Sequence, residues 1–350
     1  MSLFTVPNIK LSGLSACVPK NTEDNLDCAL LAPADREAFV NTVGIRYRRV
    51  AEAGVTASDL CVTAANQLLD DLKWAREEIK ILVFVTQTPD YTIPNTSSLL
   101  QEKLGLSKNC IAFDVNLGCS GYVYGLSIVG SLLQNMVGGK ALLLVGDIST
   151  QTISMKDKST APLFSDAGTA TGLEFSLNHE IHFNLQTDGK EFDDIIISDG
   201  GYRNRVSEKS FVEEEHAPGV LRNNLQMKLD GVKIFNFALR EIAPNINTLL
   251  TEKKIDKETV NYFVFHQANK LMIESVRKKL KIEAGKVPYS LHDFGNTSSA
   301  TIPLTMLVNL SHALTTQRVK LLLSGFGVGL SWGSCCVETE NLVCSKLIEV

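Results

Sequence analysis

Cys119 is the residue of this 350-residue chain that is best placed for nucleophilic chemistry. It follows an apolar run and Gly118, and it precedes Ser120-Gly121 and a stretch with helical spacing. A cysteine at such a strand-to-helix turn lies near a helix N-terminus, where the helix macrodipole favours the thiolate over the thiol. The thiolate is the nucleophilic form and can accept a group covalently. The alternative interpretation is a small buried hydrophobic residue, because free cysteine often packs in cores.

His266 and Asn296 are the two residues that could assist Cys119. His266 stands where an apolar run ends, and Asn296 lies in a Phe-Gly-Asn-Thr-Ser-Ser segment that is also typical of a plain turn. A single histidine or asparagine is more often structural than catalytic. The case for all three residues depends on an internal repeat, which places each of them at the end of a corresponding strand.

The repeat consists of three segments of the first half that recur, in the same order, in the second half. Residues 81–87 resemble 261–267, residues 113–120 can be aligned with 290–297, and residues 142–147 resemble 321–326. The offsets are nearly constant, which favours duplication over chance. The sequence therefore predicts two related halves, residues 1–178 with the cysteine and residues 179–350 with the histidine and the asparagine.

The elements that must position these residues alternate between strands and helices. The runs at 81–87 and 142–147 are mainly apolar, which suits strands of a sheet that is covered on both faces. Helical spacing of apolar residues is found at 57–72, 97–104 and 121–136. This pattern predicts an α/β fold with a largely parallel sheet, in which ligands gather at the C-terminal ends of the strands. Residues 150–235 are rich in polar and turn residues, and we expect loops there.

A glycine-rich turn, Gly325-Phe-Gly-Val-Gly329, is the fourth element of the predicted site. A nucleotide-binding role does not fit, because no helical pattern follows the glycines and no acidic residue stands at a second strand end. A tight turn that presents backbone N–H groups to a developing oxyanion is the better interpretation.

Composition excludes several other classes of function. The chain has 34 Lys and Arg against 39 Asp and Glu residues, a net charge of −5, which argues against nucleic-acid binding. It has no apolar run long enough to span a membrane and no signal-peptide pattern at its N-terminus. The eight cysteines include no C-x-x-C pair, and the six histidines have no metal-ligand spacing. We therefore expect a reduced, cytoplasmic, soluble protein without a metal.

Five segments together resemble the β-ketoacyl-acyl carrier protein (ACP) synthase III family. They are Asn-Leu-Gly-Cys-Ser-Gly-Tyr around Cys119, Phe-His-Gln-Ala-Asn around His266, Gly-Asn-Thr-Ser around Asn296, the C-terminal glycine-rich segment 325–333 and an early Gly-Ile-Arg at 44–46. The resemblance covers nearly the whole chain. It implies the thiolase fold, a duplicated five-layer αβαβα architecture with two pseudo-symmetric halves, and usually a homodimer.

The resemblance also implies roles for the residues. Cys119 would accept the acyl group from an acyl-CoA or acyl-ACP, and His266 and Asn296 would hold the malonyl thioester carbonyl during decarboxylation. The backbone N–H groups of Cys119 and Val328 would form the oxyanion hole, although the family usually has glycine at the latter position. The implied product is a 3-oxoacyl-ACP, and neither a cofactor nor a metal is required.

Other positions concern the carrier and the acyl chain. Well-known members use an aromatic residue to bind coenzyme A, and this chain has Ala38 at that position. They use an arginine to dock the carrier protein, and this chain has Leu271 there. These differences leave acyl-ACP as a candidate donor. Lys270 and Arg277 could dock an acidic carrier protein, or could simply form a solvated helix face. Ile93 lies where a residue of the neighbouring subunit closes the acyl tunnel in the family, and its small size suggests a primer longer than acetyl.

Two alternatives to a condensing enzyme remain at this stage, and two others are disfavoured. The first is an acyltransferase on the same fold that moves an acyl group to an oxygen or nitrogen acceptor without decarboxylation, with His266 as general base. The second is a non-catalytic acyl-carrier scaffold, which would not need the three residues. A papain-like hydrolase lacks its early Cys-Gly-Ser-Cys-Trp signature here. A thiolase would need a second catalytic cysteine, and we expect Cys335 and Cys336 to be core residues instead.

Overall fold

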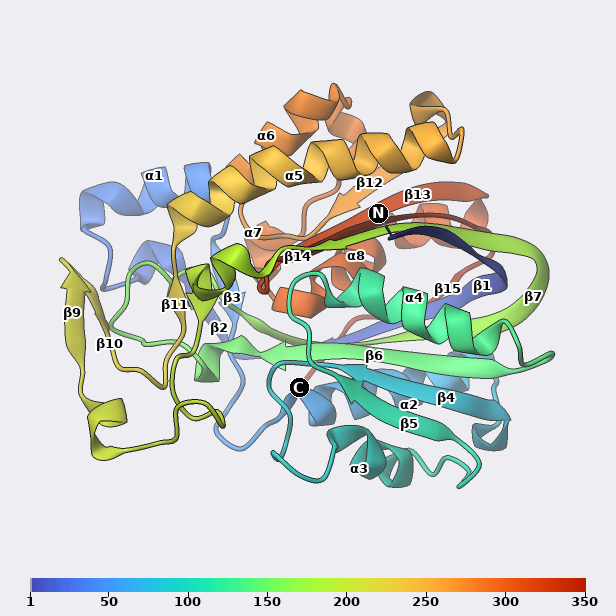
Figure 1. Cartoon of the computed structure of the whole chain (residues 1–350), viewed down its shortest axis with the longest axis horizontal. Coiled ribbons are helices and arrows are strands. Elements are labelled where there is room, and N and C mark those ends of the chain that lie inside the picture. Colours follow the sequence, from blue (N-terminus) through green and yellow to red (C-terminus); the bar gives the residue numbers. More distant parts are fainter. Residues whose placement is uncertain (1) are drawn as a thin grey trace.

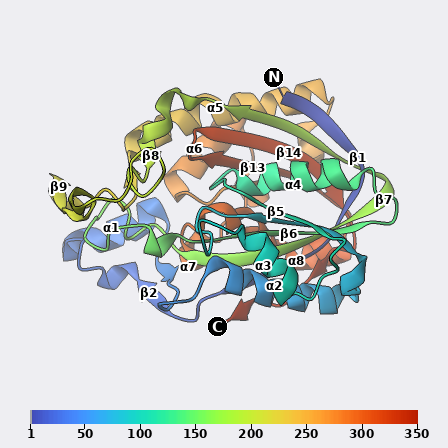
Figure 2. The same cartoon turned by 60° about the horizontal axis from the view of Figure 1, so that its bottom comes forward.

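The computed structural model describes residues 2–350 and consists of five layers (Figure 1). Helices α5 and α6 cover one sheet, α4 and α8 fill the space between that sheet and a second one, and α2 and α3 cover the outer face of the second sheet (Figures 1 and 2). The helices are α1 Pro33–Val43, α2 Ala57–Leu72, α3 Thr96–Lys103, α4 Gly121–Leu133, α5 Gly231–Glu252, α6 Lys270–Leu280, α7 Leu291–Phe294 and α8 Thr301–Thr316.

The strands form two layers that are joined by their longest members. In chain order the strands are β1 Ser2–Val18, β2 Thr22–Asp24, β3 Tyr47–Arg49, β4 Ile79–Val85, β5 Ile111–Val115, β6 Lys140–Ile148, β7 Asp166–Thr187, β8 Ile195–Ile196, β9 Glu214–Ala217, β10 Val220–Arg222, β11 Lys228–Leu229, β12 Tyr262–Phe265, β13 Val319–Gly327, β14 Ser331–Thr339, β15 Val343–Cys344 and β16 Ile348–Glu349. β7 pairs with β6 through its first part and with β14 through its last part, and β1 runs antiparallel to β7 through both layers.

The two sheets repeat one order of strands. β4 is parallel to β6, which is antiparallel to β7, and β12 is parallel to β13, which is antiparallel to β14. Two of the three sequence matches thus fall on corresponding strands, and the expected duplicated α/β architecture is confirmed. The predicted boundary after residue 178 lies inside β7 at Asn178, where φ is +65°. The division into residues 1–178 and 179–350 therefore stays a prediction.

The third match in the repeat is wrong as a strand equivalence. Residues 113–115 belong to β5, but residues 291–294 form the single helical turn α7, which ends at Gly295 with a φ of +59°. Asn296 therefore follows a turn and not a strand. It reaches the sheet edge through backbone bonds to the segment that precedes β7, since its N–H donates to Leu163 and its carbonyl accepts from Ser165, both at 3.0 Å.

β4 illustrates why these apolar runs form strands. Ile81, Val83 and Val85 pack in the central core with α4 and α8, whereas Leu82 and Phe84 pack in the outer core with α2 and α3. Successive side chains of a strand point to opposite faces, so a strand covered on both faces must be apolar at every position. The sequence prediction of doubly covered strands is confirmed here.

Most predicted helices have the expected bounds. The capping box of Thr56 and Asp59 begins α2, and Lys73 in the left-handed conformation ends it, so the helix spans residues 57–72 as predicted. α4 is shorter than the predicted 121–136, because residues 134–139 form turns around Gly138, whose φ is +71°. Residues 150–235 contain the expected loops and short strands but also the long strand β7. Among the helices within residues 2–350, none has the length and apolar character that a membrane span requires.

Candidate active site

Cys119 lies in the turn between β5 and α4, as the sequence predicts. The N–H of Gly121 donates to the carbonyl of Gly118 at 2.7 Å, and α4 begins at Gly121. The helix then runs into the central layer between the sheets, where most of its side chains are buried. The nucleophile candidate therefore stands on a rigid junction at the edge of the core.

The sulfur of Cys119 is surrounded by hydrogen-bond donors but is desolvated. Burial and, to a smaller extent, the charge of Asp147 raise the pKa of the thiol to about 12. The backbone N–H groups of Val328 and of Cys119 itself, together with the Ser298 hydroxyl, bond to the sulfur and lower its pKa by less. Burial of the sulfur therefore opposes the thiolate, whereas the helix N-terminus is expected to favour it.

The glycine-rich turn holds the cysteine in place. A Cβ atom on Gly327 would lie 2.7 Å from the Cβ and 2.9 Å from the sulfur of Cys119, and the φ of Gly327 is +157°. A Cβ on Gly325 would lie 2.9 Å from the Cys119 carbonyl oxygen. The absence of side chains at both positions lets the end of β13 approach the nucleophile, and it places the Val328 N–H against the sulfur.

His266 directly follows β12 and is buried. Its backbone N–H donates to the carbonyl of Ser324 on β13 at 2.8 Å. The ring atom Nδ1 lies 2.7 Å from the hydroxyl oxygen of Thr301. Burial lowers the pKa of the imidazole to about 3, so the ring is neutral at ordinary pH. The sequence interpretation did not include Thr301, because a threonine that opens a helix carries no specific signal.

Asn296 is buried, and its side-chain amide is oriented by one bond. The N–H of Ser298 donates to Oδ1 at 2.9 Å. Within residues 2–350 the Nδ2 group makes no hydrogen bond, although Asn296 lines the same cavity as Cys119 and His266. This leaves the amide N–H groups as donors for a ligand.

Asp147, at the end of β6, ties together the segments around the cysteine. It accepts hydrogen bonds from the N–H of Gln87 at 2.7 Å, from the hydroxyl of Ser299 at 2.6 Å and from the hydroxyl of Thr86 at 3.2 Å. These donors come from the end of β4 and from the loop after Asn296. Burial raises the pKa of the Asp147 carboxyl. A charged residue at the end of the apolar run 142–147 was the signal that could have identified it.

The three predicted residues converge on one narrow cavity. Cys119, His266 and Asn296 line it together with side chains that are mainly apolar: Phe164, Ile195, Met227, Leu229, Ile234, Ala268, Met272, Phe326 and Val328. We call it the reaction cavity. A second cavity, which we call the side cavity, adjoins it and shares Gln87, Ile195, Met227, Ser298 and Val328 with it.

The remaining predicted residues lie outside the reaction cavity. Ile93 is 81% exposed in the loop between β4 and α3, where it could reach a neighbouring subunit. Lys270 is exposed at the start of α6. The guanidinium of Arg277 donates to Glu274 at 2.8 Å and to the carbonyl of Ile282 at 2.6 Å, so docking through it would require these bonds to break.

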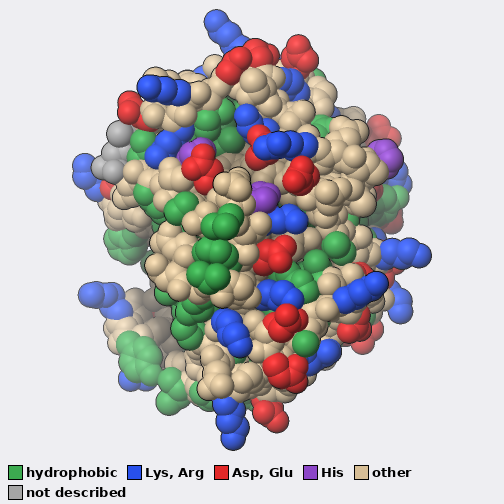
Figure 3. Space-filling view, turned by 90° about the vertical axis from the view of Figure 1, so that its right-hand side faces the viewer, with side chains coloured by type: hydrophobic (Ala, Val, Ile, Leu, Met, Phe, Trp, Pro, Cys, Tyr) green, Lys and Arg blue, Asp and Glu red, His purple; other side chains and the backbone are tan. Residues whose placement is uncertain are grey.

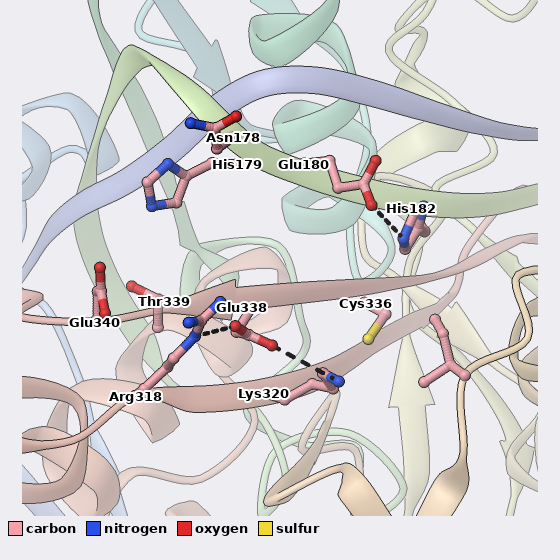
Figure 4. A pocket seen from close by; sticks show the side chains of 11 residues that line it. Asn178, His179, Glu180, His182, Arg318, Lys320, Cys336, Glu338, Thr339 and Glu340 are labelled. Atoms are coloured by element: carbon pink, nitrogen blue, oxygen red, sulfur yellow. Dashed lines mark hydrogen bonds and ion pairs between the residues drawn. The ribbon is translucent and has the colours of Figure 1, made fainter.

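A further cavity lies at the opposite end of the strands, near the bend of β7 (Figures 3 and 4). Along β13 it is about 25 Å from the site, at 3.3 Å per strand residue. Its charges pair with one another, because Arg318 and Lys320 both contact Glu338. Burial raises the pKa of the Cys336 thiol to about 12. The surface around it mixes both signs of charge (Figure 3).

The cysteines and histidines form no metal site within residues 2–350. All eight cysteines are free, and Cys335 and Cys336 are buried in β14, as expected for core residues.

Comparison with known proteins settles the family. Residues 113–189 match the model of 3-oxoacyl-ACP synthase III, and residues 250–339 match the model of its C-terminal part. A β-ketoacyl-ACP synthase III of Streptococcus agalactiae is 31% identical over 331 residues, which cover 94% of this chain and 98% of the relative. The chain belongs to the 3-oxoacyl-ACP synthase III family.

Solved synthase structures confirm the fold. A 3-oxoacyl-ACP synthase from Burkholderia xenovorans aligns with a TM-score of 0.93 and 34% identity over 99% of both chains. A β-ketoacyl-ACP synthase III from Thermus thermophilus aligns with a TM-score of 0.81 and 27% identity over 94% of this chain and 98% of the other. The five-layer thiolase fold expected from the sequence is thereby confirmed, and the chain is a condensing enzyme of the synthase III type.

Proposed function

We propose that this synthase III homologue joins an acyl thioester to malonyl-ACP with loss of carbon dioxide and releases a 3-oxoacyl-ACP. The observation that carries the proposal is the convergence of Cys119, His266 and Asn296 on one cavity, with two backbone N–H groups bonded to the sulfur. A nucleophile, two donors and a water-poor apolar wall are the parts that such a reaction needs.

In the first half-reaction, Cys119 takes the acyl group. Its sulfur forms a bond to the thioester carbonyl carbon, the bond to the carrier sulfur breaks, and the proton of Cys119 ends on the departing carrier thiol. The N–H groups of Cys119 and Val328 stabilise the negative oxygen of the tetrahedral intermediate. Because the resting residue is a thiol, the proton must leave as the attack proceeds, and a neutral thiol is a weaker nucleophile than a thiolate.

In the second half-reaction, malonyl-ACP binds with its thioester carbonyl against His266 and Asn296. The bond to the carboxylate breaks, carbon dioxide leaves, and the electron pair forms an enolate whose oxygen accepts from both side chains. The enolate carbon then attacks the acyl carbonyl, and Cys119 departs as a thiolate that is reprotonated. A neutral imidazole suits this role, since the pKa of about 3 keeps His266 from titrating near neutrality.

Two partners belong to this proposal. One is ACP, which we place against α6 near the exposed Lys270. The other is a second copy of the chain. β5 pairs only with β4 among the strands of residues 2–350, so it is an edge strand, and its Ile111 is 43% exposed. Pairing of two β5 edges would cover this edge and bring Ile93 towards the neighbouring subunit. A cytoplasmic location stays a prediction.

The deciding experiment measures intact protein mass after incubation with acyl-CoA and acyl-ACP donors, followed by malonyl-ACP. We expect an acyl adduct on the wild-type protein that Cys119→Ala lacks, and we expect malonyl-ACP to discharge it with release of carbon dioxide. An adduct that persists until an alcohol or amine acceptor is added would support the non-decarboxylating acyltransferase instead. Sedimentation analysis of the same protein tests the homodimer.

A further inference from the structure

The side cavity beside Cys119 has a polar wall. It has a volume of about 330 Å³. Its apolar lining consists of Ile195, Ile196, Ile197, Met227 and Val328. Its polar lining consists of Gln87, Thr88, Asn116, Asp147, Ser149, Thr152 and Ser298. A hydrocarbon chain in this cavity would make no hydrogen bond to these polar groups.

Some of these polar groups already have partners within the protein. Asp147 accepts from Gln87, Ser299 and Thr86, as described above. The Thr152 hydroxyl donates to the carbonyl of Ser149 at 2.8 Å, and the Thr88 hydroxyl accepts from the N–H of Ile148 at 3.0 Å. These groups build the wall and do not need a ligand.

Three side chains of the wall have free hydrogen-bonding capacity. Ser149 is only 4% exposed, yet its hydroxyl makes no hydrogen bond within residues 2–350. Gln87 and Asn116 are exposed residues that line the cavity, and their side-chain amides make no hydrogen bond within those residues either. Because these groups line the cavity and have no partner in the part of the protein that the structure describes, a ligand hydroxyl in the cavity can bond to them.

The side cavity begins beside the nucleophile. A Cβ atom on Gly118 would lie 2.3 Å from Oε1 of Gln87 and 3.2 Å from a methyl carbon of Val328. The side chains of Gln87 and Val328 therefore lie directly against the residue that precedes Cys119. A group attached to the Cys119 sulfur has two directions open to it, the reaction cavity and the side cavity.

The reaction cavity is the side from which the carrier arrives. Its lining includes Ala268 and Met272, which flank the start of α6, where Lys270 is proposed to dock ACP. The side cavity has no lining residue from α6, and its Gln87 and Thr88 lead along the chain towards Ile93. The side cavity is thus the space left for the acyl chain once the carrier occupies the other direction.

We propose that the preferred primer is an acyl group that carries a hydroxyl on one of its first carbons, with the hydroxyl bonded to Ser149 and to the amides of Gln87 and Asn116. A hydroxyl both donates and accepts, which matches one free hydroxyl and two free amides. A plain hydrocarbon chain would desolvate the same groups without replacing their bonds to water. This inference deepens the proposed function and rests on it, since it concerns the group that Cys119 accepts.

The test compares two donors that differ only by the hydroxyl. Butyryl and 3-hydroxybutyryl thioesters on the same carrier, prepared with both coenzyme A and ACP, are incubated with the full-length protein. The rate of adduct formation on Cys119 is followed by intact mass. We expect 3-hydroxybutyryl to load with a kcat/KM about tenfold higher, which corresponds to one added hydrogen bond. Equal or faster loading of butyryl overturns the inference.

Variants test whether the polar residues of the side cavity cause the preference for the hydroxylated donor. Ser149→Ala and Gln87→Leu should each lower the preference for 3-hydroxybutyryl over butyryl, measured as the ratio of the two kcat/KM values for each variant. Ser176→Ala, at the distant bend of β7, is the matched control and should keep the preference. An unchanged preference in both wall variants would overturn the inference even if the wild type prefers the hydroxylated donor.

Loading and condensation are scored separately. A loaded protein that malonyl-ACP fails to discharge counts against the proposed condensation, while a retained loading preference still supports the hydroxyl-bearing primer. A butyryl adduct that is formed faster and discharged normally supports condensation and overturns the primer inference. Failure of every donor to load Cys119 overturns both.

Discussion

The Thr301 hydroxyl oxygen lies 2.7 Å from Nδ1 of His266 and 3.0 Å from the carbonyl oxygen of Ser298. The hydroxyl has one proton, and it can donate to only one of these two acceptors. When it donates to Nδ1, the imidazole proton is on Nε2, which then can donate to a thioester oxygen. When it donates to the carbonyl, Nδ1 must carry the proton and Nε2 becomes an acceptor. The Thr301 hydroxyl is therefore coupled to the tautomer of His266, and the proposed decarboxylation needs the arrangement in which Thr301 donates to Nδ1.

Replacement of Thr301 by valine should reveal this positioning role. We expect Thr301→Val to lower the kcat of malonyl-ACP decarboxylation about tenfold, less than the roughly 10²–10³ lost when an oxyanion donor itself is removed. Acyl loading of Cys119 should be unaffected, and Thr301→Ser should restore the rate. Thr315→Val, on the exposed part of the same helix, is the control. Equal losses in loading and decarboxylation would indicate general damage to the fold instead.

The pH dependence of Cys119 alkylation tests the state of the thiol. Since burial raises its pKa to about 12, only the thiolate fraction reacts, and that fraction grows about tenfold per pH unit below the pKa. We expect the rate with iodoacetamide to rise steadily from pH 7 to pH 10, with the site identified by peptide mass and absent in Cys119→Ser. A plateau below pH 9 would show that the thiolate already forms near neutrality.

His266 should contribute no titration to decarboxylation. Burial lowers its pKa from 6.5 to about 3, so the ring stays neutral as pH falls from 8 to 5 and remains a neutral donor throughout. We expect the kcat of malonyl-ACP decarboxylation by the Cys119→Ala variant, which lacks the thiol, to be flat over this interval. His266→Gln should retain more activity than His266→Ala, because an amide also donates. A loss of activity centred near pH 6.5 would contradict the neutral-donor role.

Site residues that directly follow a strand could be predicted from the sequence. Cys119 and His266 follow apolar runs whose length and composition identify strands, and parallel strands end at one edge, so their convergence could be predicted. Asn296 was predicted for a wrong reason, because it follows the turn α7, and a sequence repeat cannot distinguish a short helix from a strand of similar residues.

Residues that act through distant partners could not be predicted in the same way. Asp147 contacts Ser299, which is 152 residues later in the chain, and Thr301 contacts His266 across 35 residues. The burial that raises the pKa of Cys119 could not be predicted either, because the local sequence reveals only the helix N-terminus. Pairings and burial of this kind exist only once the five layers have assembled.

Gly327 should tolerate no side chain. Its Cβ would lie 2.7 Å from the Cβ of Cys119, and its φ of +157° disfavours an L-residue. We expect Gly327→Ala to reduce acyl loading at least about a hundredfold, since a displacement of about 1 Å in a reacting group has effects of that size. Gly285→Ala, which meets nothing within 4 Å, should load normally. Normal loading by Gly327→Ala, measured by intact mass, would show that the close approach is not required.

Asp147→Asn should separate two effects of the buried carboxylate. An amide can replace one acceptor oxygen only, so the bonds from Gln87 and Ser299 cannot both persist, and we expect condensation to fall about ten- to a hundredfold as the loops loosen. The negative charge of Asp147 raises the pKa of Cys119, so its removal should shift the alkylation profile of the thiol towards lower pH.

Asp70→Asn, on the exposed face of α2, is the control and should change neither the condensation rate nor the alkylation profile. A variant that alkylates faster at pH 8 while it condenses more slowly would establish that Asp147 positions the site and does not activate the thiol. A parallel loss of both rates would assign it an activating role.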